Sequence, residues 1–297
     1  MQLFFNVILP IMCVFASGFV LQRIRVLDIR TMSAVSLYIL SPALVFISLY
    51  DAEFEFSYVI IVIFMFALFF FMVFLNKMLA KILKWPANLE SAAILSTGFL
   101  NSGNYGLPVV LYSIGPVALP YAVFIMVIQG LQNNFFGVYY ASRSKSGFKR
   151  SIITVMKMPT TYAMILAFLF QFSDVSIPES VHSTLSMVGD AAIPVMMILL
   201  GMQLGSMTGL NLNWQVIVSS VTLKMLIAPV FAFLFVLLFE VDPLLGSILI
   251  IISAMPPAAT TTMYAIEFDT EPELVSSITF ISTMVSIVTI TILLNLV

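Results

Sequence analysis

Ten apolar runs of about 20 residues follow one another along the chain, joined by short connections. They cover residues 3–22, 31–50, 58–80, 89–114, 117–140, 154–173, 180–205, 213–239, 243–266 and 273–296. A helix needs about 20 apolar residues to cross the hydrocarbon core of a bilayer. With 61% hydrophobic and 9% charged residues, the chain carries more apolar surface than a soluble domain can bury. The sequence predicts an all-α membrane protein with ten transmembrane helices in a lipid bilayer.

Two of these runs are interrupted by residues that do not continue a helix. The fourth contains the stretch Asn101–Pro108, which has two glycines, two asparagines and a proline, and the ninth is interrupted over residues 255–260. In hydrocarbon an unpaired backbone N–H or C=O group costs several kcal/mol. A break at membrane depth is tolerated only where it is packed in protein or lines a cavity. The two breaks are therefore the first place to look for function.

The two halves of the chain match each other in a way that indicates an internal repeat. Pro42 in the second run corresponds to Pro194 in the seventh, and the fourth and ninth runs are both broken. Five runs precede the basic stretch 141–153 and five follow it. Because five is odd, the second copy enters the membrane from the opposite side. The sequence predicts two inverted five-helix repeats, residues 1–140 and 154–297, with broken crossover helices 4 and 9 and a short cytoplasmic loop between the repeats.

The basic residues predict the orientation of the chain in the membrane. If the N-terminus starts outside, eleven of the twelve Lys and Arg residues fall in connections that face inside, and the twelfth, Lys224, lies within a run. Cytoplasmic connections carry an excess of Lys and Arg, which sets this orientation. An even number of spans then places both the N-terminus and the C-terminus outside.

Each break restarts a helix whose N-terminus is expected to point at the membrane centre. Such an end carries about half a positive elementary charge. Two facing ends make a site for an anion, typically a carboxylate. The alternative is a pair of kinked helices whose asparagines satisfy loose backbone groups. The matched breaks favour a site, for which the candidate substrate-binding residues are Asn101, Gly103, Asn104, Tyr105, Gly106, Pro108, Gln129, Asn133, Pro256, Pro257, Thr260 and Thr261.

Gln129 and Asn133 belong to this set because they lie four residues apart in the fifth run, on one helix face. Hydrogen bonding between helices is the other interpretation of such a polar pair in a membrane. Their closeness in sequence to the broken fourth run favours a place in the pocket lining.

Asp190 and Lys224 are the two ionisable residues that lie deepest inside apolar runs. At 1.5 Å per residue both are expected about 16 Å deep, near the centre of the bilayer. A charge at that depth calls for a partner, so the two are predicted to pair. The pair is either a structural link between helices or a switch that couples transport to an ion.

The sequence lacks the motifs of several other classes of protein. There is no Gly-x-Ser-x-Gly stretch, no phosphate-binding loop and no His, Cys and carboxylate cluster with metal-ligand spacing. We therefore predict that the protein is not an enzyme and holds no cofactor or metal, with coupling to protons or sodium left open. A net charge of −2 gives no indication of a nucleic-acid partner.

The chain resembles the auxin efflux carrier family, close to its bacterial, malonate-permease-like branch. The residues that carry the resemblance are Leu9-Pro10 with Gly18, Ser41-Pro42-Ala43-Leu44, Asn101–Pro108, Gly189-Asp190 with Ile193-Pro194, Gly201 with Leu204, and Pro256-Pro257. The short connection Ala141–Arg150 between the halves favours the bacterial type, which implies the bacterial inner membrane, a plasma membrane. The resemblance also implies a scaffold of the first, second, sixth and seventh spans and a moving transport domain of the others. Gly201 and Gly205 are expected to pack the scaffold against another helix or against a second subunit in a homodimer.

These observations predict a secondary active transporter that moves a small organic anion, such as a mono- or dicarboxylate, by an elevator-like alternating-access mechanism. An anion channel would use the same polar breaks. A membrane receptor or sensor would bind the anion without moving it. Both remain alternatives at this point.

Overall fold

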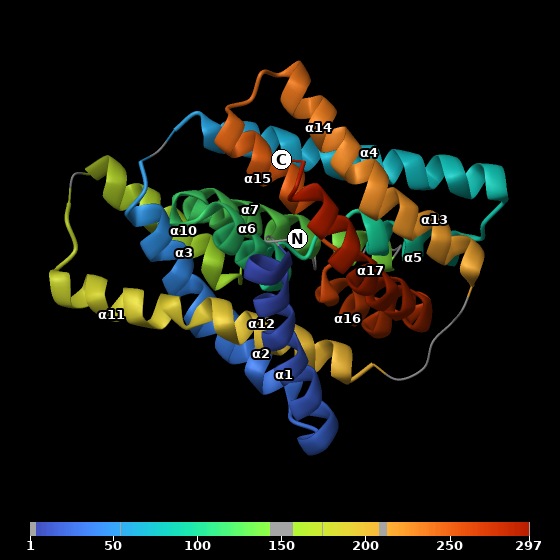
Figure 1. Cartoon of the computed structure of the whole chain (residues 1–297), viewed down its shortest axis with the longest axis horizontal. Helices are drawn as coiled ribbons and strands as arrows, with labels where there is room; N and C mark the ends of the chain where they lie inside the picture. The colour runs from blue at the N-terminus through green and yellow to red at the C-terminus, as the bar shows by residue number, and fades with distance from the viewer. Residues whose placement is uncertain (1–3, 54, 143–156, 174, 208–212, 297) are drawn as a thin grey trace.

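The computed structural model describes residues 4–53, 55–142, 157–173, 175–207 and 213–296. Within these ranges the regular structure is helical, apart from one isolated antiparallel bridge between Leu100 and Pro257. Figure 1 shows α3, α10 and α11 on the left and α13, α16 and α17 on the right, with α4 and α14 packed together along the top.

The helices of the first half, with η marking π or 3-10 segments, are η1 (Phe4–Ile8), α1 (Leu9–Arg25), α2 (Ile29–Val35), η2 (Ser36–Leu40), α3 (Ser41–Tyr50), α4 (Ser57–Leu83), α5 (Ala87–Thr97), η3 (Ser102–Gly106), α6 (Leu107–Ile114), η4 (Pro116–Ala118), α7 (Leu119–Gln132), η5 (Asn133–Gly137) and α8 (Val138–Ser142). Those of the second half are α10 (Pro159–Ser173), α11 (Glu179–Asp190), α12 (Ala192–Gly205), α13 (Trp214–Thr222), η6 (Leu223–Ile227), α14 (Ala228–Leu238), α15 (Pro243–Ser253), α16 (Ala259–Glu267) and α17 (Pro272–Leu293).

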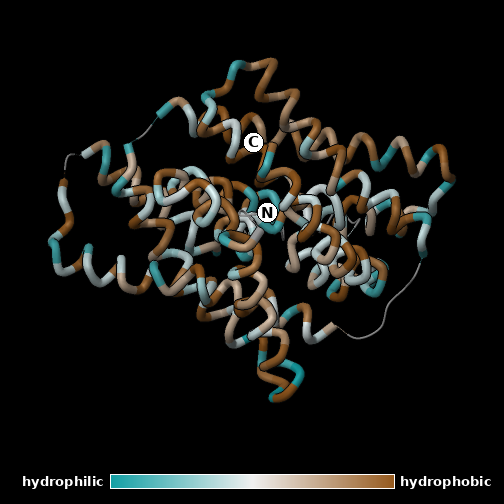
Figure 2. The backbone as a smooth tube through the Cα atoms, viewed as in Figure 1, coloured by the Kyte–Doolittle hydropathy of each residue, from teal (hydrophilic) through white to brown (hydrophobic). Residues whose placement is uncertain are grey.

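In the described part of the chain, seven helical stretches are long and apolar enough to cross a membrane. They are Phe5–Arg25, Ile29–Tyr50, Ser57–Leu83, Pro116–Ser142, Glu179–Gly205, Trp214–Leu238 and Pro272–Leu293. Figure 2 shows hydrophobic residues along most of α4 and α14, two of the helices in these stretches. The predicted all-helical, multi-pass membrane protein is confirmed.

The other three predicted spans correspond to shorter helices. The fourth is divided into α5 and α6, the ninth into α15 and α16, and the sixth matches α10. The count of ten spans therefore stays a prediction. Of the predicted loop 141–153 only residues 141 and 142 can be placed, because residues 143–156 lie outside the described ranges.

Proline explains most of the π-helical segments. Four of the five π segments run into an α-helix with proline at its second residue, namely Pro10, Pro42, Pro108 and Pro229. Proline lacks an N–H group and clashes with the carbonyl four residues earlier. A local π turn lets the next available N–H groups pair with the freed carbonyls. A bond of the π type runs from Gly106 N–H to Asn101 O over 2.9 Å, in the segment just before Pro108.

Helices α1 and α12 pack closely enough that glycine is required where they meet. A Cβ atom at Gly201 would lie 1.9 Å from Phe15 O, and one at Gly18 would lie 2.1 Å from Ile198 O. Small residues at such positions let two helix backbones approach each other in a membrane. Gly205 also faces α1. Gly201 and Gly205 therefore pack against another helix of the same chain, which was the first of the two predicted alternatives.

On the other side of α12, the segments α10 and α11 both pack along α3 (Figure 1). The side chain of Gln171 in α10 donates hydrogen bonds to the carbonyl oxygens of Leu49 and Ala52. Two close groups result, α1 with α12 and α10 and α11 with α3, and smaller contacts join α12 to α2 and α11.

We expect Gly201→Ala to destabilise the protein, because the added methyl group overlaps a backbone carbonyl, which cannot move aside as the end of a flexible side chain can. Overpacking a close interface costs about 3 kcal/mol, measurable as a lower unfolding free energy in detergent. Gly130→Ala is the matched control, because its Cβ would meet only the mobile end of Met158 at 3.0 Å. Equal stability of the two variants would contradict the close packing of α1 on α12.

Candidate functional site

The two broken segments cross and pair through their backbones. Helix α5 ends before Gly98 and α15 ends before Ala254. Between the helix pairs, Leu100 and Pro257 form the antiparallel bridge. Its two hydrogen bonds run from Asn101 N–H to Pro256 O (2.9 Å) and from Ala258 N–H to Phe99 O (3.2 Å). The juxtaposition of the two breaks, expected from the sequence, is present in the structure.

Each break uses a different means to satisfy its backbone at this depth. Leu100 N–H donates to the side-chain Oε1 of Gln129 in α7 at 3.2 Å. Pro256 and Pro257 have no N–H group, so the break in the ninth segment leaves two fewer donors to satisfy. Every unpaired donor would cost several kcal/mol in hydrocarbon. Gln129 is 2% exposed and completes this arrangement.

A chain of polar side chains connects α7 to the restarted helix α16. Gln129 Nε2 donates to Asn133 Oδ1 (3.4 Å), and Asn133 Nδ2 donates to Thr260 Oγ1 (3.4 Å). One turn further along, Tyr264 OH donates to Asn134 Oδ1 at 3.0 Å. The predicted pair Gln129 and Asn133 therefore bonds between helices and also borders the crossing, so both interpretations of the pair hold.

Both restarted helices begin without a side-chain cap. The residues at the two N-cap positions, Asn101 and Ala258, make no side-chain hydrogen bond to the first turn. Segment η3 continues directly into α6, so the N–H groups of Ser102–Tyr105 form the first turn of one longer helix. The first-turn N–H groups of a helix have no carbonyl before them to bond within the helix. They are the groups that an anion at a helix N-terminus takes as partners.

A cavity of about 430 Å³ lies at the crossing. Six of the predicted residues line it, namely Asn101, Gly103, Asn104, Gln129, Asn133 and Thr260. The Asn101 side chain is 5% exposed, and its Nδ2 donates to no acceptor among the described residues. An unsatisfied donor at this depth indicates that the cavity wall is built to face a polar group.

The other six predicted residues lie beside the cavity without lining it: Tyr105, Gly106, Pro108, Pro256, Pro257 and Thr261. The ring of Tyr105 is fully buried against Phe15, and its hydroxyl accepts from Ser286 Oγ at 3.1 Å. Thr261 is fully buried and donates to Ala258 O at 2.7 Å, within its own helix start. These side chains shape the crossing and do not face the cavity.

Several lining residues were missed by the sequence reasoning. Polar examples are Ser33 in α2, Lys157 in the turn before α10, and Gln203 in α12. The sequence identifies Lys157 as one of the eleven basic residues in connections predicted to face inside, and it carries no other signal for a cavity position. Nothing in the local sequence of Gln203 places it beside residues more than fifty positions away.

The predicted pairing of Asp190 with Lys224 is wrong in this structure. Lys224 in η6 is fully buried, and its Nζ has no hydrogen-bond partner in the part of the chain described. Asp190 ends α11 and is exposed, and no ion pair joins it to Lys224. The position of Lys224 within its apolar run correctly predicted that its side chain is buried. Position along a helix does not determine which way a helix face points, so it could not predict the partner.

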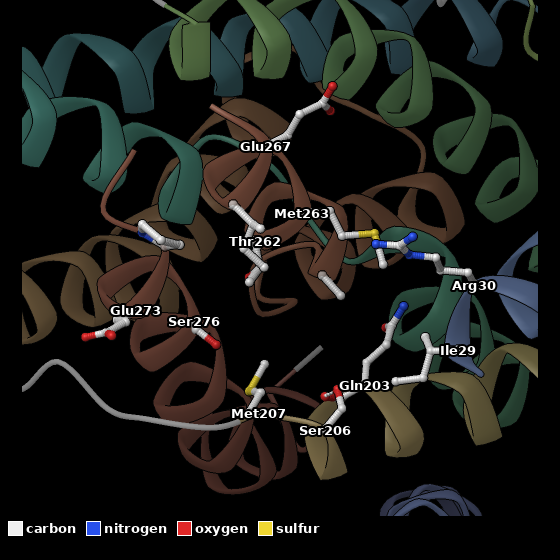
Figure 3. A pocket seen from close by; sticks show the side chains of 13 residues that line it. Ile29, Arg30, Gln203, Ser206, Met207, Thr262, Met263, Glu267, Glu273 and Ser276 are labelled. Carbon is white, nitrogen blue, oxygen red and sulfur yellow. Dashed lines mark hydrogen bonds between the residues drawn. The ribbon is translucent and has the colours of Figure 1, made fainter. Parts of the chain in front are cut away.

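A second cavity, of about 780 Å³, shares Gln203, Ala259 and Met263 with the first. Figure 3 shows Arg30 and Gln203 on one side of it and Glu273 and Ser276 on the other. Arg30 and the turn before α17 both belong to connections predicted to face inside. The larger cavity thus adjoins the crossing cavity through three shared residues, on the side that the predicted orientation places inside.

The start of α2 holds Arg30 at this cavity. Asp28 caps the helix, accepting from the Thr31 hydroxyl (2.6 Å) and from Arg30 N–H (3.0 Å). These hydrogen bonds, the one from Thr31 first, hold the pKa of the Asp28 carboxyl below its usual value.

A helical membrane protein with two broken helices crossing beside a cavity that polar side chains line in part has the architecture of a membrane transporter, and comparison with known proteins agrees. Residues 145–294, half of the chain, match the membrane transport protein family. The chain belongs to this family, the auxin efflux carriers. Membership of a transporter family agrees with the prediction of a non-enzymatic protein. The malonate-permease-like branch within the family stays a prediction.

Two archaeal proteins are similar along most of their length. An uncharacterized transporter of Methanocaldococcus jannaschii is 26% identical over 272 residues, covering 88% of this chain and 87% of the relative. An uncharacterized transporter of Methanothermobacter thermautotrophicus is 26% identical over 300 residues, covering 95% of each chain.

We expect Gln129→Leu to weaken the crossing, because it leaves Leu100 N–H buried without an acceptor. Such a loss costs about 1–3 kcal/mol and should appear as a lower unfolding free energy in detergent, with faster hydrogen exchange at Leu100. Gln132→Leu is the matched control, since Gln132 is equally buried in α7 and its Nε2 has no partner among the described residues. If Gln132→Leu proves the more damaging change, Gln129 does not hold the break.

We expect Asp190→Asn and Lys224→Met to act independently, because the two side chains do not meet. In a double-mutant cycle of unfolding free energies in detergent, the coupling should stay within about 0.5 kcal/mol. A coupling well above that value would show that the two side chains do interact, as an ion pair would.

Proposed function

We propose that the protein is a secondary active transporter of a small organic anion, such as a mono- or dicarboxylate, which binds at the crossing. The observation that supports this most directly is the cavity between two uncapped helix N-termini, with the buried, unpartnered Nδ2 of Asn101 in its wall. Each helix end contributes about +0.5 elementary charge in a medium of low dielectric constant.

Further positive charge lies where an anion would arrive. Lys157 lines the crossing cavity and Arg30 lines the adjoining one. Cations around a cleft raise the local concentration of an anionic ligand and its rate of association. The carboxylates Glu267 and Glu273 lie on the far side of the adjoining cavity, so the field there is mixed.

We propose further that the chain makes ten membrane crossings arranged as two inverted repeats of five. Two features support this: segments 87–114 and 243–267 break at matching positions, and α1 packs on α12 as α10 packs on α3. On this proposal α1, α2, α3 and α10–α12 form a scaffold, and the crossing helices move against it in an elevator mechanism. The cavities would then open toward the inside face.

The remaining features of the proposal follow from the basic residues and the family. The protein would lie in a plasma membrane, as in the bacterial inner membrane, with both termini outside. Transport would be coupled to protons or sodium without a bound cofactor. A homodimer through the scaffold helices is part of the same proposal.

The proposal is tested by counterflow of labelled carboxylates in proteoliposomes with imposed pH and sodium gradients. Saturable counterflow of at least one organic anion is expected. A non-saturating conductance would favour an anion channel, and binding without movement would favour a receptor or sensor.

We expect Asn101→Ala to lower counterflow about tenfold, since a hydrogen bond to a charged group is worth about 1.5–3 kcal/mol. Ser113→Ala is the control, because Ser113 lies in α6 outside the cavity lining and donates to Val109 O of its own helix. Equal counterflow in wild type and Asn101→Ala would place the anion elsewhere.

A further inference from the structure

Gln203 lies on the wall shared by the two cavities. It stands near the C-terminal end of α12, and with Ala259 and Met263 it lines both spaces. Figure 3 shows its amide extending from α12 into the cavity, on the same side as Arg30. The residue therefore faces the route between the crossing and the inside face.

The amide oxygen of Gln203 lacks a hydrogen bond. Its Oε1 is buried and accepts from no donor in the described part of the chain. A buried acceptor without a donor is unfavourable by about 1–3 kcal/mol. A carbonyl oxygen only accepts hydrogen bonds, so the group that satisfies it must carry an N–H or O–H.

The side of the smaller cavity at the crossing has the complementary requirement. There the groups are donors, namely Asn101 Nδ2, which has no partner among the described residues, and N–H groups at the uncapped starts of the two restarted helices. A carboxylate satisfies these donors but offers nothing to Gln203, because an ionised carboxylate only accepts. One ligand meets both walls only if it bears a carboxylate and, apart from it, a hydrogen-bond donor.

We propose that Gln203 is a specificity-determining residue that selects hydroxy-carboxylates over carboxylates without a hydroxyl group. The inference rests on the proposed function and names the substrate class of the same site. The carboxylate binds at the crossing, and the hydroxyl group donates to Gln203 Oε1. A site built to pair with a hydroxyl rejects the analogue that lacks it, because its own polar atom is then left unpaired.

Two other cavity residues with unpartnered oxygens do not make this selection. Thr262 Oγ1 lines the larger cavity and Ser33 Oγ lines the smaller one, and each is buried without a partner in the described residues. A hydroxyl group both donates and accepts. The hydroxyl groups of Ser33 and Thr262 can therefore bond equally well to a carboxylate with or without a hydroxyl group.

The test compares matched pairs of anions in proteoliposomes of the full-length protein. Lactate is compared with propionate, and malate with succinate, as competitors of counterflow. We expect the hydroxylated member of at least one pair to compete about tenfold better, the equivalent of one hydrogen bond. This comparison in wild type needs no variant, so it stands even if a substitution prevents folding.

Gln203→Met removes the acceptor at similar length. We expect this variant to lose the preference for the hydroxylated member of each pair. The carboxylate without a hydroxyl group should compete as in wild type to within about threefold, because it makes no hydrogen bond to Gln203 that the substitution could remove. Ser206→Ala is the matched control, because Ser206 lines the larger cavity from the same helix end and donates to Gln203 O of its own backbone at 2.8 Å. It should keep the preference.

The outcomes separate this inference from the function on which it rests. Counterflow of carboxylates with no preference for the hydroxylated member would overturn the role of Gln203 and leave the transporter proposal standing. A preference that survives Gln203→Met would also overturn it. Absence of counterflow for all four anions would overturn this substrate class, and counterflow of other labelled organic anions would then decide the transporter proposal on its own.

Discussion

The need to hydrogen-bond every backbone polar group at membrane depth governs the centre of this molecule. Two helices are broken there, and water is not available to take up the freed N–H and C=O groups. The two breaks form hydrogen bonds to each other at the bridge of Leu100 and Pro257. The N–H group of Leu100 is not used in the bridge, and Gln129 Oε1 accepts from it. The two prolines at 256 and 257 reduce the number of donors that need a partner.

The same arrangement creates a polar surface in an apolar environment. Both helices restart without a capping side chain, and their N-terminal ends, which carry partial positive charge, line the cavity. Another part of the cavity wall is supplied by α12, whose position depends on its close contact with α1 at Gly18 and Gly201. Packing between helices distant in sequence thus sets which polar residues line the cavity together.

The sequence predicted the elements of the site better than the directions of its side chains. Asn101, Gln129 and Asn133 line the cavity as expected, because polar side chains in apolar runs are rarely oriented toward lipid. Tyr105 does not, because at a π turn its ring points into the core beside Phe15. Lys224 is buried as its depth in the run indicated, yet without the partner that depth alone suggested.

By itself the sequence determined that the protein is helical and membrane-spanning, and where its two long apolar segments break, because run length and glycine and proline act locally along the chain. Only the tertiary structure decided which backbone groups of the two breaks pair, that Asp190 and Lys224 stay apart, and that Gln203 reaches the cavity. These features depend on how helices far apart in sequence rotate and cross. The packing of glycines and side chains between the helices sets that arrangement, and no local sequence pattern contains it.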